Sequence, residues 1–225
     1  MKVCTDACLF GALVADCKTC LPAGGLSITN CLDIGTGTGL LPLILAQKNN
    51  SLKIDAVEID ALAAAQATEN IAASHWAGNI QVFNEDIVSY NPQQAYDCII
   101  SNPPFFEDDL LSADENKNDA KHSTALNLIQ LLNVVKRLLR NTGFFAVMLP
   151  YHRLDYFIEE AEKIGLYVSK QILVRQTMKH KFFRAILFLS YKQNQPEHID
   201  IIIKDTENNY TPQFAAALKD YYLFL

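Results

Sequence analysis

The sequence alternates short apolar runs with segments of helical periodicity, and few folds accommodate that order. Strand-like apolar runs lie at 28–34, 53–59, 79–83, 96–101 and 144–149. Helical patterns lie at 40–48, 61–74, 123–140 and 154–163, and Gly143 is expected to end the third of these helices. Strands that alternate with helices predict a parallel sheet covered on both faces. Segments 166–174 and 182–191 predict a closing antiparallel strand pair.

The predicted fold is therefore α/β: a doubly wound, seven-stranded, mostly parallel sheet whose last strand pair is antiparallel. A chain of 225 residues suffices for a single domain, 1–225. We expect a helical cover over 1–26, the core sheet over 27–192, and a strand and helix extension over 193–225. In such sheets, ligands bind beyond the carboxyl ends of the strands, so the loops after the first four strands are the expected site.

A turn of Asn102, Pro103, Pro104 and Phe105 follows the fourth predicted strand. Asn102 offers a side-chain carbonyl acceptor, and Pro103 has no N–H that would compete for an acceptor. Phe105 offers a flat face for a planar ring. These groups suit a planar NH2 group as substrate. A rigid loop that only ends a strand is the alternative.

A glycine-rich turn follows the first predicted strand, with Asp-Ile-Gly-Thr-Gly-Thr-Gly at residues 33–39. Glycine lets the backbone pass close to a ligand, and the next helix supplies free N–H groups at its start. Dinucleotide-binding folds use a similar turn. Asp33, however, places a carboxylate near the ligand, which suits a cationic sulfonium better than a pyrophosphate.

Two further acids end neighbouring strands. Glu58 closes the second strand, where an acid accepts hydrogen bonds from both hydroxyls of a ribose. Asp86 follows the third strand, where an acid accepts from an adenine amine. For each acid, a turn or helix cap is the alternative role. Their joint occurrence with the Asn102 turn favours a nucleoside-binding edge.

Together these motifs resemble class I, Rossmann-like S-adenosylmethionine-dependent methyltransferases that modify exocyclic or amide nitrogens. Segments 1–13, 65–74 and 209–218 make the chain similar, more narrowly, to bacterial tRNA1(Val) adenine-37 N6-methyltransferases. The resemblance implies S-adenosylmethionine as cofactor, a tRNA substrate, transfer to N6 of adenine 37, and catalysis by residues 102–105. The residues expected to bind the cofactor are Thr5, Asp6, Asp33, Ile34, Gly35, Thr36, Gly37, Gly39, Glu58, Ile59, Asp86, Ile87 and Asn102.

Charge is distributed unevenly along the chain. The net charge of −6 argues mildly against a nucleic-acid partner, but residues 134–192 carry 11 basic and 4 acidic side chains. Lys179, Lys181 and Arg184 flank two phenylalanines and are the expected contacts with RNA phosphates. A plain basic hairpin is the alternative.

No apolar run is long enough to span a membrane, and the first residues lack the pattern of a signal peptide. We therefore expect a cytoplasmic protein without membrane contact or an obligate protein partner. Cys17 and Cys20 have a spacing found in zinc sites, but no second such pair or paired histidines accompany them, so no metal is expected. Reduced thiols are expected instead.

Other functions remain compatible with parts of this pattern. A protein glutamine amide, guanine N2 of rRNA, or a DNA adenine would fit the same Asn-Pro-Pro-Phe turn. A non-catalytic nucleotide-binding module or a nicotinamide dehydrogenase would explain the glycine-rich turn, but the turn at Asn102 argues against both.

Overall fold

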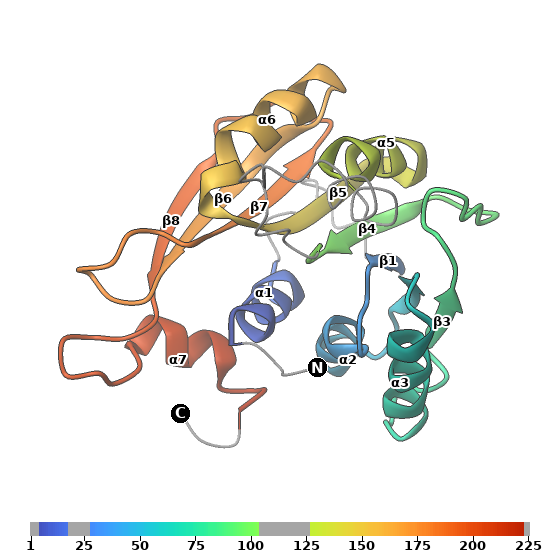
Figure 1. The fold of residues 1–225 in the computed structure, drawn as a ribbon, viewed down its shortest axis with the longest axis horizontal. Helices are drawn as coiled ribbons and strands as arrows, with labels where there is room; N and C mark the ends of the chain where they lie inside the picture. Colours follow the sequence, from blue (N-terminus) through green and yellow to red (C-terminus); the bar gives the residue numbers. More distant parts are fainter. Residues whose placement is uncertain (1–4, 18–27, 104–126, 223–225) are drawn as a thin grey trace, which may run out of the picture.

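The computed structural model describes residues 5–17, 28–103 and 127–222. Within these residues, a mixed sheet lies between two layers of helices (Figure 1). The strands are β1 Asn30–Ile34, β2 Lys53–Glu58, β3 Ile80–Asn84, β4 Tyr96–Ser101, β5 Leu139–Pro150, β6 Tyr167–Arg175, β7 Arg184–Ser190 and β8 Glu197–Ile202. The helices are α1 Thr5–Ala15, α2 Leu40–Lys48, α3 Ala61–Ala72, α5 Leu128–Leu138, η1 Tyr151–Arg153, α6 Leu154–Lys163 and α7 Pro212–Leu218.

The sheet has the strand order β3-β2-β1-β4-β5-β7-β6-β8. β7 runs antiparallel to both of its neighbours, and the other neighbouring strands of this sheet pair in parallel. The doubly wound architecture and the antiparallel pair β6–β7 are thus confirmed. The predicted count of seven strands is wrong, because β8 adds an eighth strand beside β6 within the described residues. The strand order reverses between β1 and β4, where such folds bind their ligands.

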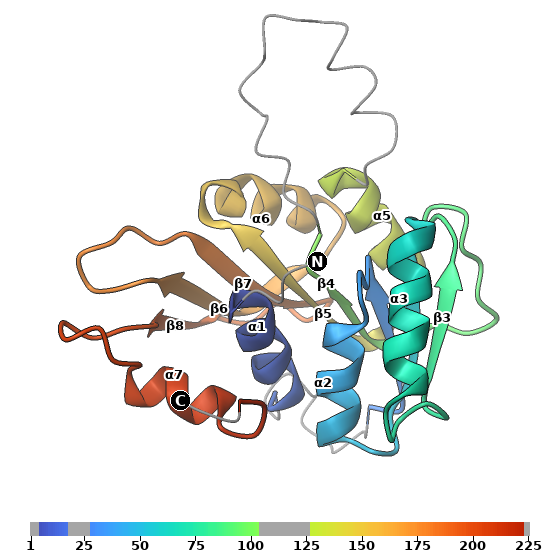
Figure 2. The same cartoon turned by 60° about the horizontal axis from the view of Figure 1, so that its bottom comes forward.

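Each face of the sheet is covered by its own set of helices. Residues of α1, α2, α3 and α7 form one apolar cluster with one face of the sheet, and residues of α5 and α6 form a second cluster with the other. Figure 2 shows α1 between α2 and α7 on the first face. α1 and α2 approach closely at Gly11, where an added Cβ would lie 2.9 Å from the Cδ1 atom of Ile44.

The boundary between α5 and β5 differs from the prediction. α5 ends at Leu138, and Gly143 lies inside β5 instead of ending the helix. The pairing of β4 with β5 shifts register there, so that β5 carries extra residues that have no partner on β4. A Cβ atom at Gly143 would lie 2.7 Å from the carbonyl oxygen of Asp97. Gly143 is therefore required by a close strand contact and not by a helix end.

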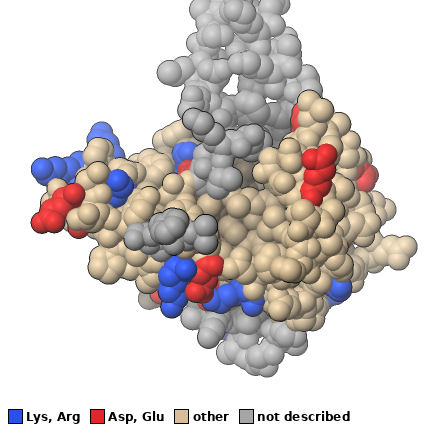
Figure 3. All heavy atoms as spheres, turned by 90° about the horizontal axis from the view of Figure 1, so that it is seen from below, with Lys and Arg blue, Asp and Glu red and all other residues tan. Residues whose placement is uncertain are grey.

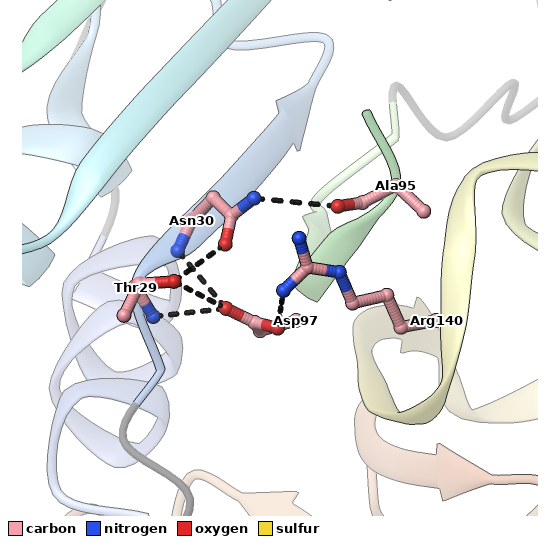
Figure 4. A network of polar contacts seen from close by, with 5 residues as sticks. All are labelled: Thr29, Asn30, Ala95, Asp97 and Arg140. Atoms are coloured by element: carbon pink, nitrogen blue, oxygen red, sulfur yellow. Dashed lines mark hydrogen bonds and ion pairs between the residues drawn. The ribbon is translucent and has the colours of Figure 1, made fainter. Parts of the chain in front are cut away.

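A polar network holds the amino-terminal ends of β1 and β4 together (Figure 4). The Asp97 carboxylate accepts hydrogen bonds from the backbone N–H of Thr29 at 2.9 Å and of Asn30 at 3.2 Å, and pairs with Arg140. The Asn30 amide donates to the carbonyl of Ala95 at 3.3 Å. This network lies at the sheet edge opposite the carboxyl ends of β1 and β4.

The cysteines agree only in part with the expected reduced thiols. Cys31 and Cys98 are free, buried and opposite one another in the β1–β4 register. Cys17, just past α1, is disulfide-bonded, so the expectation of reduced thiols is wrong there. Among the described helices, none combines the length and apolar character needed to cross a membrane.

Candidate active site

The strand register aligns the predicted motifs in one row. Ile34 pairs with Val57 on one side and with Ser101 on the other. Gly35, Glu58 and Asn102, which each follow by one residue, therefore lie side by side at the carboxyl edge of the sheet, on strands about 5 Å apart.

The glycine-rich turn adopts a conformation that requires its glycines. Gly35, Gly37 and Gly39 have φ values of +71°, +59° and +83°, in the region that disfavours side chains. The N–H of Gly35 donates to the carbonyl of Val57 at 2.9 Å, which ties the turn to β2. An added Cβ at Gly35 would meet no atom of the described residues within 4 Å, so these residues leave space in front of this backbone.

The Glu58 carboxylate forms a hydrogen bond with the same glycine-rich turn. Its Oε2 atom accepts from the N–H of Gly37 at 2.8 Å, and its Oε1 atom accepts from the N–H of Asp60 at 2.9 Å. A carboxylate oxygen accepts about two hydrogen bonds, so each oxygen keeps capacity for a ligand hydroxyl. The next side chain, Ile59, is 55% exposed despite being apolar.

Asp33 is the most unusual group at this edge. Its side chain is fully buried, and neither carboxylate oxygen meets a hydrogen-bond donor within the described part of the chain. Burial raises the pKa of Asp33 to about 7, and the charge of Glu58 adds to the rise. The Thr36 hydroxyl is near enough to lower this pKa in part, but it does not meet the geometry of a hydrogen bond to either oxygen. A buried carboxylate without a donor calls for a positively charged or donating group that is not part of these residues.

The loop after β3 carries Asp86 and Ile87. The Oδ1 atom of Asp86 accepts from the N–H of Val88 at 2.9 Å, so its side chain stabilises a turn. Ile87 is buried in the second apolar cluster. The guanidinium of Arg137, on α5, donates to the carbonyls of Tyr90 at 2.7 Å and Ile87 at 3.2 Å. Arg137 thus fixes this loop, a role for which nothing in its local sequence gives a signal.

Asn102 begins the turn after β4. The Ser101 hydroxyl donates to the carbonyl of Ile34 at 3.0 Å, which locks the end of β4 against β1. The Oδ1 atom of Asn102 is buried and has no hydrogen-bond donor among the described residues, and Pro103 is buried beside it. An acceptor of this kind is available to an incoming NH2 group. Pro104 and Phe105 lie outside the described residues.

The amino end of α1 is fixed to the same edge. The Asp6 carboxylate accepts from the Nε atom of Arg184 at 2.8 Å, and Arg184 begins β7. Burial raises the pKa of Tyr222, whose hydroxyl lies beside Thr5, so the carboxyl-terminal segment also packs against α1. Thr5 and Asp6 are thus brought to the edge that carries Asp33.

The predicted RNA contacts lie further along this edge. The turn between β6 and β7 exposes Lys179 and Lys181, and it lies at the carboxyl end of β6. Arg184, in contrast, is half-buried in its ion pair with Asp6. The structure therefore separates Arg184 from the two exposed lysines.

The acceptors at the edge fit a nucleoside that carries a positive charge. Glu58 keeps acceptor capacity, and among the described residues Asp33 has no donor and no atom fills the space in front of Gly35. S-adenosylmethionine has ribose hydroxyls, a sulfonium and an ammonium group, so the residues present fit this cofactor.

Comparison with known proteins agrees with this geometry. The family model for the methyltransferase small domain matches residues 1–147. The chain is 37% identical, over its full length and 88% of the relative, to the tRNA1(Val) (adenine(37)-N6)-methyltransferase of Pectobacterium carotovorum. It is 38% identical to the enzyme of the same name from Trichodesmium erythraeum, over 99% of this chain and 91% of the relative.

A solved structure shares the fold. The crystal structure of a predicted O-methyltransferase from Agrobacterium tumefaciens aligns with a TM-score of 0.68 at 14% identity, over 95% of each chain. The fold, the match to the methyltransferase domain and the whole-chain identity agree with the resemblance seen in the sequence. The chain belongs to the tRNA1(Val) (adenine(37)-N6)-methyltransferase family.

Proposed function

We propose that this chain transfers a methyl group from S-adenosylmethionine to the exocyclic N6 amine of adenine 37 in tRNA1(Val), next to the anticodon. Whole-chain identity to enzymes of that name supports the choice of substrate. The observation that carries the chemistry is the buried Oδ1 atom of Asn102, which has no donor among the described residues and lies one strand away from Gly35.

Residues from four segments would hold the cofactor. Glu58 would accept from the ribose hydroxyls, and Asp86 would accept from the adenine amine. Asp33 would face the positive charge, with Thr5 and Asp6 near the methionine end. When bound, S-adenosylmethionine supplies an electrophilic methyl group. Ile34, Thr36, Gly37, Gly39, Ile59 and Ile87 complete the proposed set through backbone and apolar contacts.

The protein contributes mainly alignment and charge stabilisation. The lone pair of an adenine amine is delocalised into the ring, which makes it a poor nucleophile. Acceptance of its two hydrogens by Asn102 Oδ1 and the Pro103 carbonyl would favour a pyramidal nitrogen and stabilise the positive charge that develops there. Pro104 would restrict the turn, and Phe105 would stack on the base.

The target base must leave its stack to reach Asn102, so the substrate surface has to hold an unpaired loop. Lys179 and Lys181 are exposed at the same edge and suit its phosphates. The sequence predicts that Arg184 contacts RNA directly. We propose instead that Arg184 holds Asp6 in position. Because tRNA is the substrate, we place the enzyme in the cytoplasm and invoke no obligate protein partner.

The test is methyl transfer from labelled S-adenosylmethionine to total tRNA, bulk rRNA, DNA and ribosomal protein extract, assayed in parallel. The proposal predicts label in tRNA alone. Label only in protein would indicate a glutamine amide substrate, and label only in rRNA would indicate guanine N2. Either result would overturn the proposed substrate while leaving the role of Asn102 intact.

A further inference from the structure

An aromatic cluster lies beside the proposed site and belongs to neither apolar core. The ring of Tyr151, in η1, lies 5.5 Å from the ring of Phe182 at 45°. The guanidinium of Arg175 lies 5.0 Å over the same Phe182 ring. The N–H of Tyr151 donates to the carbonyl of Phe183 at 3.1 Å, which joins η1 to the turn between β6 and β7. These residues come from three segments that the sheet brings together.

The strand register places this cluster close to Asn102. Ser101 pairs with Val147 on β5, so Asn102 is level with Met148. β5 continues to Pro150, and Tyr151 follows directly. With about 5 Å between strands and about 3.3 Å per residue, the backbone of Tyr151 lies roughly 11 Å from that of Asn102. The cluster therefore lies within a short reach of the base held at Asn102.

The side chains of this cluster are partly exposed to solvent, unlike the aromatic side chains of the two apolar cores. The side chain of Tyr151 is 40% exposed, and that of Met178, in the same turn, is 60% exposed. Phe182 supports Tyr151 from one side, and Arg175 supports Phe182. The Nε atom of Arg175 is buried without an acceptor in the described part of the chain. The Tyr151 ring therefore packs against Phe182 and leaves part of its surface open to solvent.

The charge around the cluster suits RNA. Residues 175–184 contain four Lys and Arg side chains and no Asp or Glu. The neighbouring loop, 203–211, is tied to this turn by the N–H of Lys204, which donates to the carbonyl of Gln176 at 2.9 Å. In Figure 3, cations gather at the left end of the molecule, where Figure 1 places these two loops, with acidic side chains beside them.

We propose that Tyr151, backed by Phe182 and Arg175, stacks on an unpaired base that neighbours the methylated adenine in the RNA substrate. Base–aromatic stacking tolerates any base, because every base has a π-face. The lysines of the turn would contact the flanking phosphates. Tyr151 is thus a specificity residue for an open, single-stranded loop. This inference rests on the proposed tRNA substrate.

The test begins with Tyr151→Ala and Tyr151→Phe. Removal of a stacked ring predicts a rise in KM for tRNA1(Val) of roughly tenfold to hundredfold, with KM for S-adenosylmethionine unchanged. Tyr151→Phe keeps the ring and should match the wild type. Phe182→Leu keeps an apolar side chain but removes the ring that supports Tyr151, and should raise the same KM. Tyr156→Ala is the matched control, since Tyr156 is also 40% exposed but lies on α6.

A second measurement identifies the contact directly. Anticodon stem-loops with an abasic site immediately 5′ or 3′ of adenine 37 are assayed with the wild type and with Tyr151→Ala. If Tyr151 stacks on the missing base, the abasic site weakens binding to the wild type but adds no loss to the variant. Equal losses for both proteins, or a variant with wild-type KM, would overturn the inference. A wild-type enzyme that methylates no tRNA would instead refute the proposed function.

Discussion

The Nε atom of Arg184 donates a 2.8 Å hydrogen bond to the Oδ2 atom of Asp6, and this contact joins the start of β7 to the start of α1. It places Asp6 at the carboxyl edge of the sheet, the edge that also carries Asp33. Both side chains are largely buried, so loss of either partner leaves the other charge poorly compensated. We therefore expect Arg184 to influence the cofactor side of the proposed site.

Arg184→Ala should raise KM for S-adenosylmethionine several-fold and leave KM for tRNA unchanged, because α1 loses its anchor. Steady-state kinetics with each substrate varied in turn separates the two effects. Asp6→Asn should give the same pattern, and the double variant should add little to it. An increase confined to KM for tRNA would contradict this role and indicate that Arg184 contacts the RNA.

Asp33 should make cofactor binding depend on pH. Burial raises its pKa to about 7, so in the free protein it is protonated below that pH. In the unfolded chain the pKa is about 4, so this group lowers stability as the pH rises from about 4 to 7. A cationic ligand favours the ionised form, so affinity for S-adenosylmethionine should rise as the pH approaches 7.

Calorimetric titration in buffers of different ionisation enthalpy measures the proton released when S-adenosylmethionine binds below pH 7. Asp33→Asn should weaken binding and remove both the proton release and the pH dependence. Proton release that persists in Asp33→Asn would assign the effect to another group.

Lys179 and Lys181 should contribute to RNA affinity through charge alone. Each phosphate contact with a single strand contributes about 0.7 to the slope of log affinity against log salt, so Lys179→Gln with Lys181→Gln should reduce that slope by about 1.4. Lys136→Gln with Lys192→Gln is the matched control. Both of these lysines are exposed, and the hydrogen bond from Tyr191 to the Lys136 carbonyl places them together near the end of β7, at the opposite edge. Equal slopes for the two double variants would contradict the assignment.

The Asp97 network should stabilise the fold without affecting catalysis (Figure 4). Burial alone would raise the pKa of Asp97, but hydrogen bonds from Thr29, Asn30 and Arg140 outweigh it and lower the pKa. A lowered pKa stabilises the folded state above about pH 4, and this stabilisation is lost as the pH falls further.

Asp97→Asn should cost about 2 kcal/mol of unfolding free energy at neutral pH, and less in acid, as measured by urea unfolding across pH. The kcat of the folded variant should match that of the wild type. A cost that is the same at every pH would show that the charge of Asp97 does not contribute.

Strong local patterns made several elements predictable. The bounds of α2, β4 and α6 agree with the sequence prediction, because each apolar pattern ends at clear polar or turn residues. The alignment of Gly35, Glu58 and Asn102 followed from the rule that parallel strands share a carboxyl edge.

The features that the sequence does not predict depend on contacts between segments that are distant along the chain. The sequence predicts β8 only as part of an extension, because its sequence, Glu-His-Ile-Asp-Ile-Ile, is half polar and short, as suits an edge strand. The roles of Arg137, Tyr151 and Arg184 arise from hydrogen bonds and ring contacts across many residues of sequence. No local pattern around these three residues reports such contacts.

The central claim is that Asn102 presents its free Oδ1 atom to the N6 amine of adenine 37. The most direct test is nucleoside mass spectrometry of a tRNA1(Val) transcript after incubation with S-adenosylmethionine and either the wild type or Asn102→Ala. We predict N6-methyladenosine at position 37 with the wild type. We predict none with the variant, which should still bind S-adenosylmethionine with nearly unchanged affinity. Wild-type levels of N6-methyladenosine from Asn102→Ala, or methylation at another position, would contradict the account.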